Sequence, residues 1–103
     1  MIARIWRGHP PAAKAGAYLE YLNKTGIPDY TSLPGNRGVR VLLHVDDERA
    51  EFLLMSTWDS MEAIREFTGN DVDKAVYYPE DGDYLLEFEP NVRHYEVVVD
   101  LTQ

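Results

Sequence analysis

The spacing of hydrophobic residues switches along the chain between two periods, and each switch marks the start of a new predicted element. Alternating apolar and polar positions are typical of strands, whereas apolar residues at i, i+3, i+4 and i+7 are typical of helices. The predicted strands are residues 2–8, 39–45, 51–58 and 92–100. The main predicted helices begin near Ala12 and just after Ser60, so the order of elements is βαββαβ.

The first predicted helix has a clear end signal. Gly26 and then Pro28 follow its last apolar position. A glycine favours the left-handed stop of a helix, and a proline after it prevents the helix from continuing. Further prolines and glycines up to Gly38 indicate a loop over residues 28–38.

The second predicted helix follows directly on the most hydrophobic strand, which ends at Trp58. Asp59 or Ser60 is expected to cap it, because a short polar side chain there can accept a free backbone N–H. A shorter helical piece is predicted over residues 71–79 and ends at its proline. Residues 84–88 fit either a helical turn or an irregular loop.

The βαββαβ order predicts one α+β domain that spans residues 1–103. This is the ferredoxin-like plan, a four-stranded antiparallel sheet with helices on one face and strand order 4-1-3-2. The far face of such a sheet should be polar. Here Leu42, Leu53 and Met55 fall on the face opposite to their apolar neighbours. We therefore predict a homodimer that packs sheet against sheet; the alternative is that the central strands are simply hydrophobic on both sides.

Composition narrows the classes of partner. The net charge is −8, with 18 acidic residues against 10 basic ones. Nucleic acids and anionic membranes are disfavoured as partners, because both need a basic surface. The chain has no cysteine, which excludes disulfides and thiolate chemistry. No segment reads as a signal peptide or a membrane span, so a soluble, cytoplasmic protein is expected.

Several segments together resemble the antibiotic biosynthesis monooxygenase-like family of dimeric α/β barrels. They include Pro34-Gly35 ahead of the second strand, the strand 51–58 that ends on Trp58, and the segments 67–71, 77–80 and 92–97. The resemblance implies a pocket between the sheet and the helices. Relatives in this family include cofactor-independent oxygenases of phenolic compounds and haem-degrading enzymes.

The haem-degrading relatives use a histidine on the second helix, a tryptophan and an asparagine on the first strand. This chain has no histidine between Ser60 and Pro79 and no asparagine in its first strand. The resemblance therefore favours a cofactor-free, monooxygenase-like protein without a metal. Such chemistry needs an apolar slot, a base and a group that stabilises an anion.

Candidate groups for this chemistry lie on three predicted strands and on one connecting segment. His94 is the candidate base because its pKa lies near neutrality, although a solvated histidine is common on an edge strand. Trp58 has an N–H that needs a partner when buried, and Arg4 could hold an anionic oxygen or pair with a carboxylate such as Glu96. The candidate substrate-binding residues are aromatic: Trp6, Tyr77, Tyr78 and Tyr95.

Two functions are compatible with this sequence. The first is a cofactor-independent, monooxygenase-like protein that binds a small apolar or aromatic metabolite between sheet and helices. The second is a non-catalytic small-molecule-binding or interaction protein on the same dimeric scaffold, in which these aromatic residues serve packing. An enclosed cavity of roughly 300 Å³ or more beside Trp58 would favour a pocket, since ligand sites have about this size.

Overall fold

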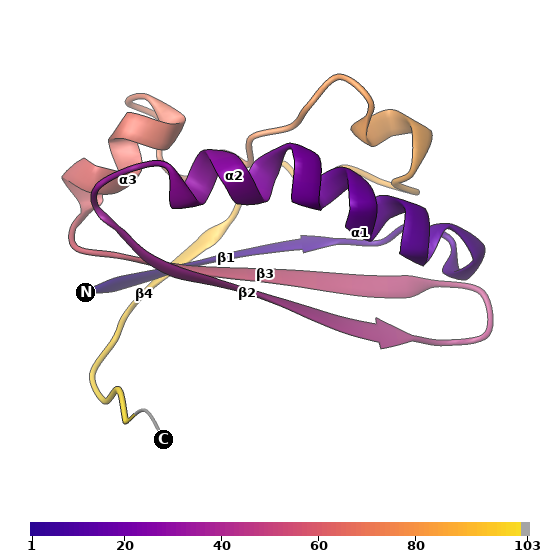
Figure 1. The fold of residues 1–103 in the computed structure, drawn as a ribbon, viewed down its shortest axis with the longest axis horizontal. Coiled ribbons are helices and arrows are strands. Elements are labelled where there is room, and N and C mark those ends of the chain that lie inside the picture. Colours follow the sequence, from indigo (N-terminus) through magenta and orange to yellow (C-terminus); the bar gives the residue numbers. More distant parts are fainter. Residues whose placement is uncertain (102–103) are drawn as a thin grey trace.

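The protein has one four-stranded antiparallel sheet with helices on one face (Figure 1). The structure is a computed structural model, and it describes residues 1–101. In chain order the elements are β1 (Ile2–Gly8), a 3₁₀ turn η1 (Ala12–Lys14), α1 (Ala15–Lys24), α2 (Gly26–Thr31), β2 (Asn36–Val45), β3 (Ala50–Trp58), α3 (Met61–Thr68), a second 3₁₀ turn η2 (Asp81–Asp83) and β4 (Arg93–Glu96).

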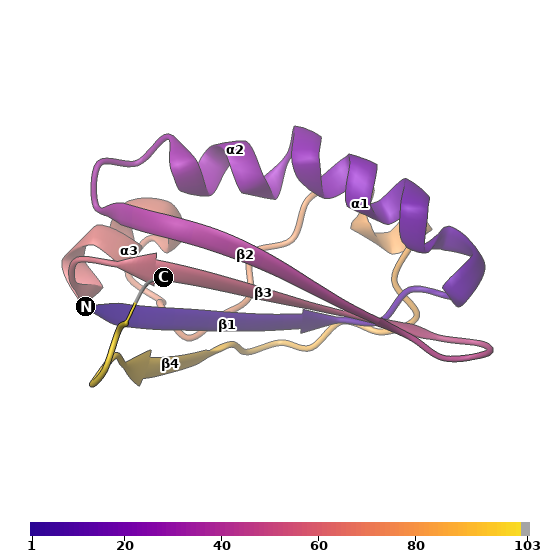
Figure 2. The same cartoon turned by 60° about the horizontal axis from the view of Figure 1, so that its bottom comes forward.

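The strand order is β2-β3-β1-β4, which confirms the predicted ferredoxin-like topology (Figure 2). β3 alternates strictly between buried and half-buried residues, because its even positions face the helices and its odd positions face away. In the register of β1 and β3, Arg4 lies opposite Ser56 and Trp6 lies opposite Leu54 on the helix-facing side. This register places a charged residue in the middle of an apolar layer.

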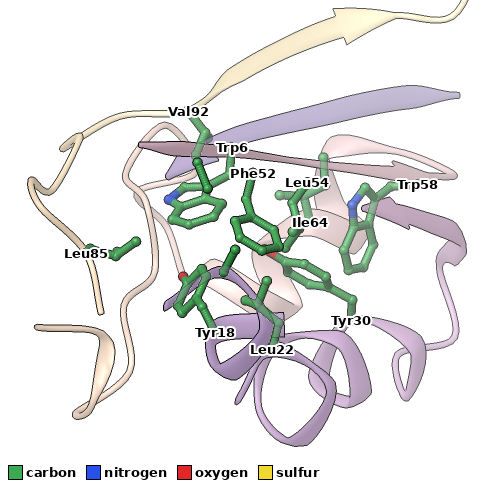
Figure 3. Packing of buried hydrophobic residues seen from close by; sticks show 12 residues of the cluster. Trp6, Tyr18, Leu22, Tyr30, Phe52, Leu54, Trp58, Ile64, Leu85 and Val92 are labelled. Carbon is green, nitrogen blue, oxygen red and sulfur yellow. The ribbon is translucent and has the colours of Figure 1, made fainter. Parts of the chain in front are cut away.

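The core lies between the sheet and the helices, and aromatic side chains fill much of it. Figure 3 shows Trp6 and Trp58 near its two ends, with Phe52 and Leu54 of β3 between them. Tyr18 of α1 meets Phe52 edge-on, with 5.2 Å between the ring centroids. Such edge-to-face pairs stabilise the folded state by about 1 kcal/mol beyond the effect of the area that they bury.

The first helical region is longer than the sequence signals indicate. α1 does end just before Gly26, at Lys24, but Gly26 has no left-handed conformation and Pro28 does not end the helical region, because α2 begins at Gly26 and runs to Thr31. The loop predicted over residues 28–38 is therefore wrong over residues 28–31, and β2 already begins at Asn36. Pro28 is the third residue of α2, where backbone N–H groups have no partner within the helix. A proline therefore costs no hydrogen bond at this place.

The helical piece predicted over residues 71–79 is also wrong. Residues 73–75 run beside 90–92 instead, with hydrogen bonds from Ala75 N–H to the Pro90 carbonyl (2.9 Å) and from Val92 N–H to the Asp73 carbonyl (2.8 Å). Bonds to distant segments outweigh the local helical pattern here. The last strand is shorter than predicted, since β4 ends at Glu96.

The junction between β3 and α3 follows the prediction. Ser60 is the N-cap of α3, and its hydroxyl accepts a hydrogen bond from Ala63 N–H. Gly69 ends the helix with a positive φ of 78°, which a glycine adopts at low cost. Asp59 N–H also donates to the Gly35 carbonyl at 2.9 Å, so this junction is tied to the loop before β2.

Gly35 allows this loop to approach α3, and this suggests a matched pair of variants. A Cβ at Gly35 would lie 2.3 Å from Ala63 Cβ, whereas a Cβ at Gly16 on the exposed side of α1 meets nothing within 4 Å. We expect Gly35→Ala to lower the free energy of unfolding by about 1–3 kcal/mol through overpacking. Gly16→Ala should raise it by about 0.5 kcal/mol, because alanine favours helix. Urea unfolding of both variants tests this, and equal effects would contradict the close packing of Gly35.

Candidate functional site

Arg4 is the most unusual side chain of the helix-facing layer. It is only 2% exposed, and its Nη1 and Nη2 donate to the carbonyls of Val72 (2.7 Å) and Lys74 (3.0 Å). The guanidinium also lies 5.8 Å from the ring centroid of Phe67. Burial lowers the pKa of Arg4, but an arginine keeps its charge at neutral pH. A carboxylate such as Glu96 is not among its hydrogen-bond partners; backbone carbonyls stabilise the charge instead.

His94 lies on β4 opposite Arg4 and connects it to Asp73. Its Nε2 is 3.3 Å from Arg4 Nη1, and its Nδ1 is 3.3 Å from a carboxylate oxygen of Asp73. Arginine can only donate, so Nε2 accepts and Nδ1 carries the proton. Burial and the positive charge of Arg4 lower the pKa of His94, against the opposing effect of Asp73. His94 is therefore neutral at pH 7, with both ring nitrogens engaged.

Trp58 is fully buried at the end of β3. Its indole N–H donates to Ser56 Oγ at 2.9 Å, which supplies the partner that a buried indole requires. The ring packs edge-on against Tyr30 and roughly parallel to Phe67. Trp58 thus belongs to the packed core, and it lines neither of the two hollows described next.

A small cavity lies further along the same layer, beside Trp6. Its volume is about 20 Å³, which is room for one water molecule. The residues around it are mostly aromatic or apolar: Trp6, Tyr18, Leu22, Gly26, Tyr30, Leu54, Val76, Tyr78 and Asp81. This cavity is far smaller than the 300 Å³ that a pocket would need.

Asp81 is the one carboxylate in the wall of this cavity, and sequence reasoning missed it. It is 3% exposed; Tyr18 donates its hydroxyl proton to Oδ1 (3.3 Å), and Tyr78 N–H donates to Oδ2 (2.6 Å). Burial raises the pKa of Asp81 despite these two hydrogen bonds. The surrounding Glu80-Asp-Gly-Asp83 sequence is typical of a solvated turn, so no local signal marks Asp81 as buried.

A larger hollow lies on the outer side of the segment 76–78. Its volume is about 330 Å³, and it is lined by Asp29, Ser32, Leu33, Glu66, Phe67, Val76 and Tyr78. Val76 and Tyr78 border both the inner cavity and this outer hollow. We call residues 76–78 the strap. The Tyr78 hydroxyl donates to Asp29 Oδ2 at 2.5 Å, which fastens the strap to α2.

Trp6 and Tyr77 form a second connection at the strap. The Trp6 N–H points to the Tyr77 hydroxyl at 3.4 Å, and this hydroxyl donates to the Glu89 carbonyl. The rings of Trp6 and Tyr77 meet edge-on with 6.2 Å between centroids. Three of the candidate substrate-binding residues, Trp6, Tyr77 and Tyr78, therefore come together, with Trp6 and Tyr78 in the cavity wall.

Tyr95 lies on the opposite side of the sheet. It pairs with Ala3, is 48% exposed, and borders an open hollow of about 470 Å³ that Arg7 and Arg93 also line. His44 is on the far edge strand from His94, as predicted, and contacts Asp46 at 3.1 Å. Within residues 1–101, no three histidine or acidic side chains are arranged to hold a metal ion.

Comparison with known families gives a match over most of the chain. Residues 1–76 match the model of the family described as antibiotic biosynthesis monooxygenase. The chain belongs to this family. A comparison with curated proteins gave no match.

Solved structures of this family are similar in fold. One is a Bacillus cereus protein assigned as an antibiotic biosynthesis monooxygenase, with a TM-score of 0.66, 18% identity, and coverage of 99% of this chain and 97% of that one. Another is the haem-degrader MhuD from Mycobacterium tuberculosis with two haems in its active site; the TM-score is 0.61, with 21% identity and coverage of 99% and 100%. At such identities the similarity concerns the fold.

The helices are too short to suggest a membrane span. Within residues 1–101, no helix is long and apolar enough to cross a bilayer.

The raised pKa of Asp81 predicts a pH-dependent stability. The folded protein holds this proton more tightly than the unfolded chain does, so the corresponding stability is fully present below pH 3.8, the ordinary value, and is lost as pH rises through the folded pKa. Asp81→Asn removes this pH-dependent loss of stability, because asparagine does not ionise. We expect the variant to gain stability relative to the wild type between about pH 3.5 and about pH 7 in urea unfolding.

Asp83→Asn is the control, because Asp83 is exposed in the same turn. It should show no such trend. A constant difference between Asp81→Asn and wild type across this range would contradict the burial of an ionisable Asp81.

Proposed function

We propose that this protein is monooxygenase-like and binds a small apolar or aromatic molecule between the sheet and the helices, on the inner side of the strap. The observation that carries the proposal is the pair of hollows that share Val76 and Tyr78. The inner one has aromatic walls and a buried carboxylate, and the outer one has a volume of about 330 Å³. Displacement of the strap would join them into a space of ligand size.

The residues of the strap support such a displacement. The strap has no regular secondary structure, and side chains fasten it at only a few points, among them the bonds from Tyr78 to Asp29 and from Tyr77 to Glu89. Segments with few backbone hydrogen bonds open locally at low free energy. The helices and strands around the cavity could then stay in place while a ligand enters.

Family membership supports a reaction with dioxygen. A base removes a proton from an enolisable substrate, and the resulting anion passes electrons to oxygen. When one substrate methylene becomes a carbonyl, one oxygen atom enters the product and the other leaves as water. The substrate supplies all four electrons, so the balance requires no further reductant.

Haem is the other ligand that the similar structures suggest, because MhuD is described with haem in its active site. The residues of this chain do not fit haem. α3 carries no histidine, and the only histidine in the helix-facing layer of the sheet has both nitrogens engaged, by Arg4 and Asp73.

Arg4, Trp58 and His94 form a second part of the proposal. They lie near the point where the chain turns from α3 towards the strap, and Arg4 holds the carbonyls of Val72 and Lys74 just before it. We propose that these residues position the strap. Direct contact between His94 and the substrate would first require that Arg4 release its Nε2.

Oxygen consumption with enolisable aromatic substrates, such as anthrones and hydroquinones, tests the proposed reaction. We expect uptake above the rate in buffer. Trp6→Phe should slow it about tenfold, the equivalent of roughly 1.4 kcal/mol for a lost wall contact and N–H donor. His94→Ala should also slow it, and the matched His44→Ala on the other edge strand should equal the wild type.

The outcomes separate the two functions. Saturable binding of these substrates without oxygen uptake would favour a non-catalytic binding protein on the same scaffold. Neither binding nor uptake would refute the proposal.

We also propose that the protein forms a homodimer through the open face of the sheet. Leu42 and Tyr95 on this face are 49% and 48% exposed, and the half-buried Ile5, Leu53 and Met55 lie between them. Beyond β4 the chain continues with exposed valines; Val98 is 84% exposed. A second copy would cover this apolar surface, which a monomer of this size would otherwise leave in water.

Light scattering tests the dimer. We expect about twice the chain mass of 11.8 kDa at micromolar concentration. Leu42→Glu should shift the protein to the monomer mass, because it places a charge within the apolar contact. Leu19→Glu is the matched control on the outer side of α1, where Leu19 is 36% exposed, and it should remain dimeric. A wild-type monomer would refute this part of the proposal.

A further inference from the structure

We propose that Asp81 is the base that accepts the proton of an ionisable hydroxyl, phenolic or enolic, on the molecule bound inside the strap. This inference rests on the proposed function and specifies its ligand class. It assigns the proton transfer to a residue of η2 rather than to His94 on β4.

The carboxylate of Asp81 has free accepting capacity at the cavity. A carboxylate has about four lone-pair sites, and the described contacts use one on each oxygen, from Tyr18 and from the Tyr78 N–H. Asp81 itself forms part of the cavity wall. In the closed structure this acceptor is oriented by two hydrogen bonds, and the one from Tyr18 does not involve the strap.

No cation neutralises this carboxylate among residues 1–101. Asp81 forms no salt bridge with any described residue. The nearby Lys14 donates its ammonium proton to the Asp83 carbonyl instead, at 2.7 Å. The negative charge of Asp81 raises the pKa of five tyrosine hydroxyls around it, which therefore stay neutral: Tyr18, Tyr21, Tyr30, Tyr77 and Tyr78. A buried carboxylate without a cation gains by taking up a proton. His94, by contrast, is held beside the positive charge of Arg4.

The proton transfer is balanced within the cavity. The O–H bond of the ligand breaks, its proton moves to an Asp81 oxygen, and the electron pair stays on the ligand oxygen. The negative charge thereby passes from the protein to the ligand, and the total charge does not change. Tyr18 and Trp6 line the same wall. In the closed structure the Tyr18 hydroxyl donates to Asp81 and the Trp6 N–H points to Tyr77. The Tyr18 hydroxyl can turn to the new anion once Asp81 holds the proton, and displacement of the strap, which carries Tyr77, frees the Trp6 N–H.

The same environment selects the class of ligand. The walls are the rings of Trp6, Tyr18 and Tyr30 with Leu54 between them, which suits a flat aromatic molecule. A carboxylic acid would bring a second negative charge beside Asp81, and like charges disfavour each other in a buried site. An ether of the same shape would offer no proton. Phenols and enols are therefore preferred over both.

Opening of the strap and exposure of the base are coupled. The Tyr78 N–H holds Asp81 Oδ2, while its ring faces Gly26, where a Cβ would be 3.8 Å from the ring. When Tyr78 swings outward to admit a ligand, this N–H leaves the carboxylate. One more lone pair of Asp81 then becomes free at the moment when the hydroxyl arrives.

The test uses 1-naphthol and its ether 1-methoxynaphthalene as probes, titrated at neutral pH against wild type, Asp81→Asn and Asp83→Asn. Wild type and Asp83→Asn should bind 1-naphthol about tenfold more tightly than the ether, because a hydrogen bond to a buried carboxylate is strong. Asp81→Asn should show a preference below about twofold. Bound naphthol should also emit as the naphtholate in wild type and as neutral naphthol in Asp81→Asn, since excitation makes it a strong acid that needs a nearby base.

Each outcome decides between the claims. If neither probe binds wild type, the proposed function fails and the inference fails with it. If both probes bind all three proteins equally well, the proposed function stands and the assignment of Asp81 is overturned. Should Asp81→Asn not fold, wild type alone gives the answer: neutral emission from naphthol bound to it would overturn the inference.

Discussion

The architecture depends on a buried positive charge at the centre of the sheet. Arg4 projects from β1 into the layer that the helices cover, where an unpaired guanidinium would be costly. Its Nη1 and Nη2 donate to the carbonyls of Val72 and Lys74, while its Nε has no hydrogen-bond partner among the described residues. The two bonds fix the chain after α3 across the face of the sheet. These bonds, with those that pair residues 73–75 with 90–92, hold the chain here in a turn and an irregular path rather than in the predicted helix.

The strap follows directly on the segment that Arg4 holds. The strap closes the aromatic layer from outside, so the space between sheet and helices is almost filled in the closed state. Its last residue, Tyr78, binds both Asp29 on the surface and Asp81 within. Through its side chain and its backbone N–H, this one residue joins the outer hollow, the inner cavity and the one carboxylate among the described residues of the cavity wall. In the proposed function, a ligand therefore enters by local opening rather than into a preformed pocket.

Sequence patterns predicted the sheet well, because alternation of side chains is a local property that burial enforces. The end of β3 at Trp58 and the cap of α3 by Ser60 fall where expected. The partners of charged groups could not be predicted in this way, since they come from distant segments: His94 meets Arg4 and Asp73 only after the chain has folded back. Asp81 is the clearest case, because its local sequence is that of a solvated turn while tertiary packing buries it.

The central claim is that an aromatic ligand enters between the sheet and the helices on the inner side of the strap. Intermolecular NOEs between bound 1-naphthol and the protein measure this directly. The account predicts contacts from the naphthol ring to the indole of Trp6 and to the methyl groups of Leu54, both of which border the cavity. Contacts confined to Met55 and Leu42, on the open face of the sheet, would contradict it.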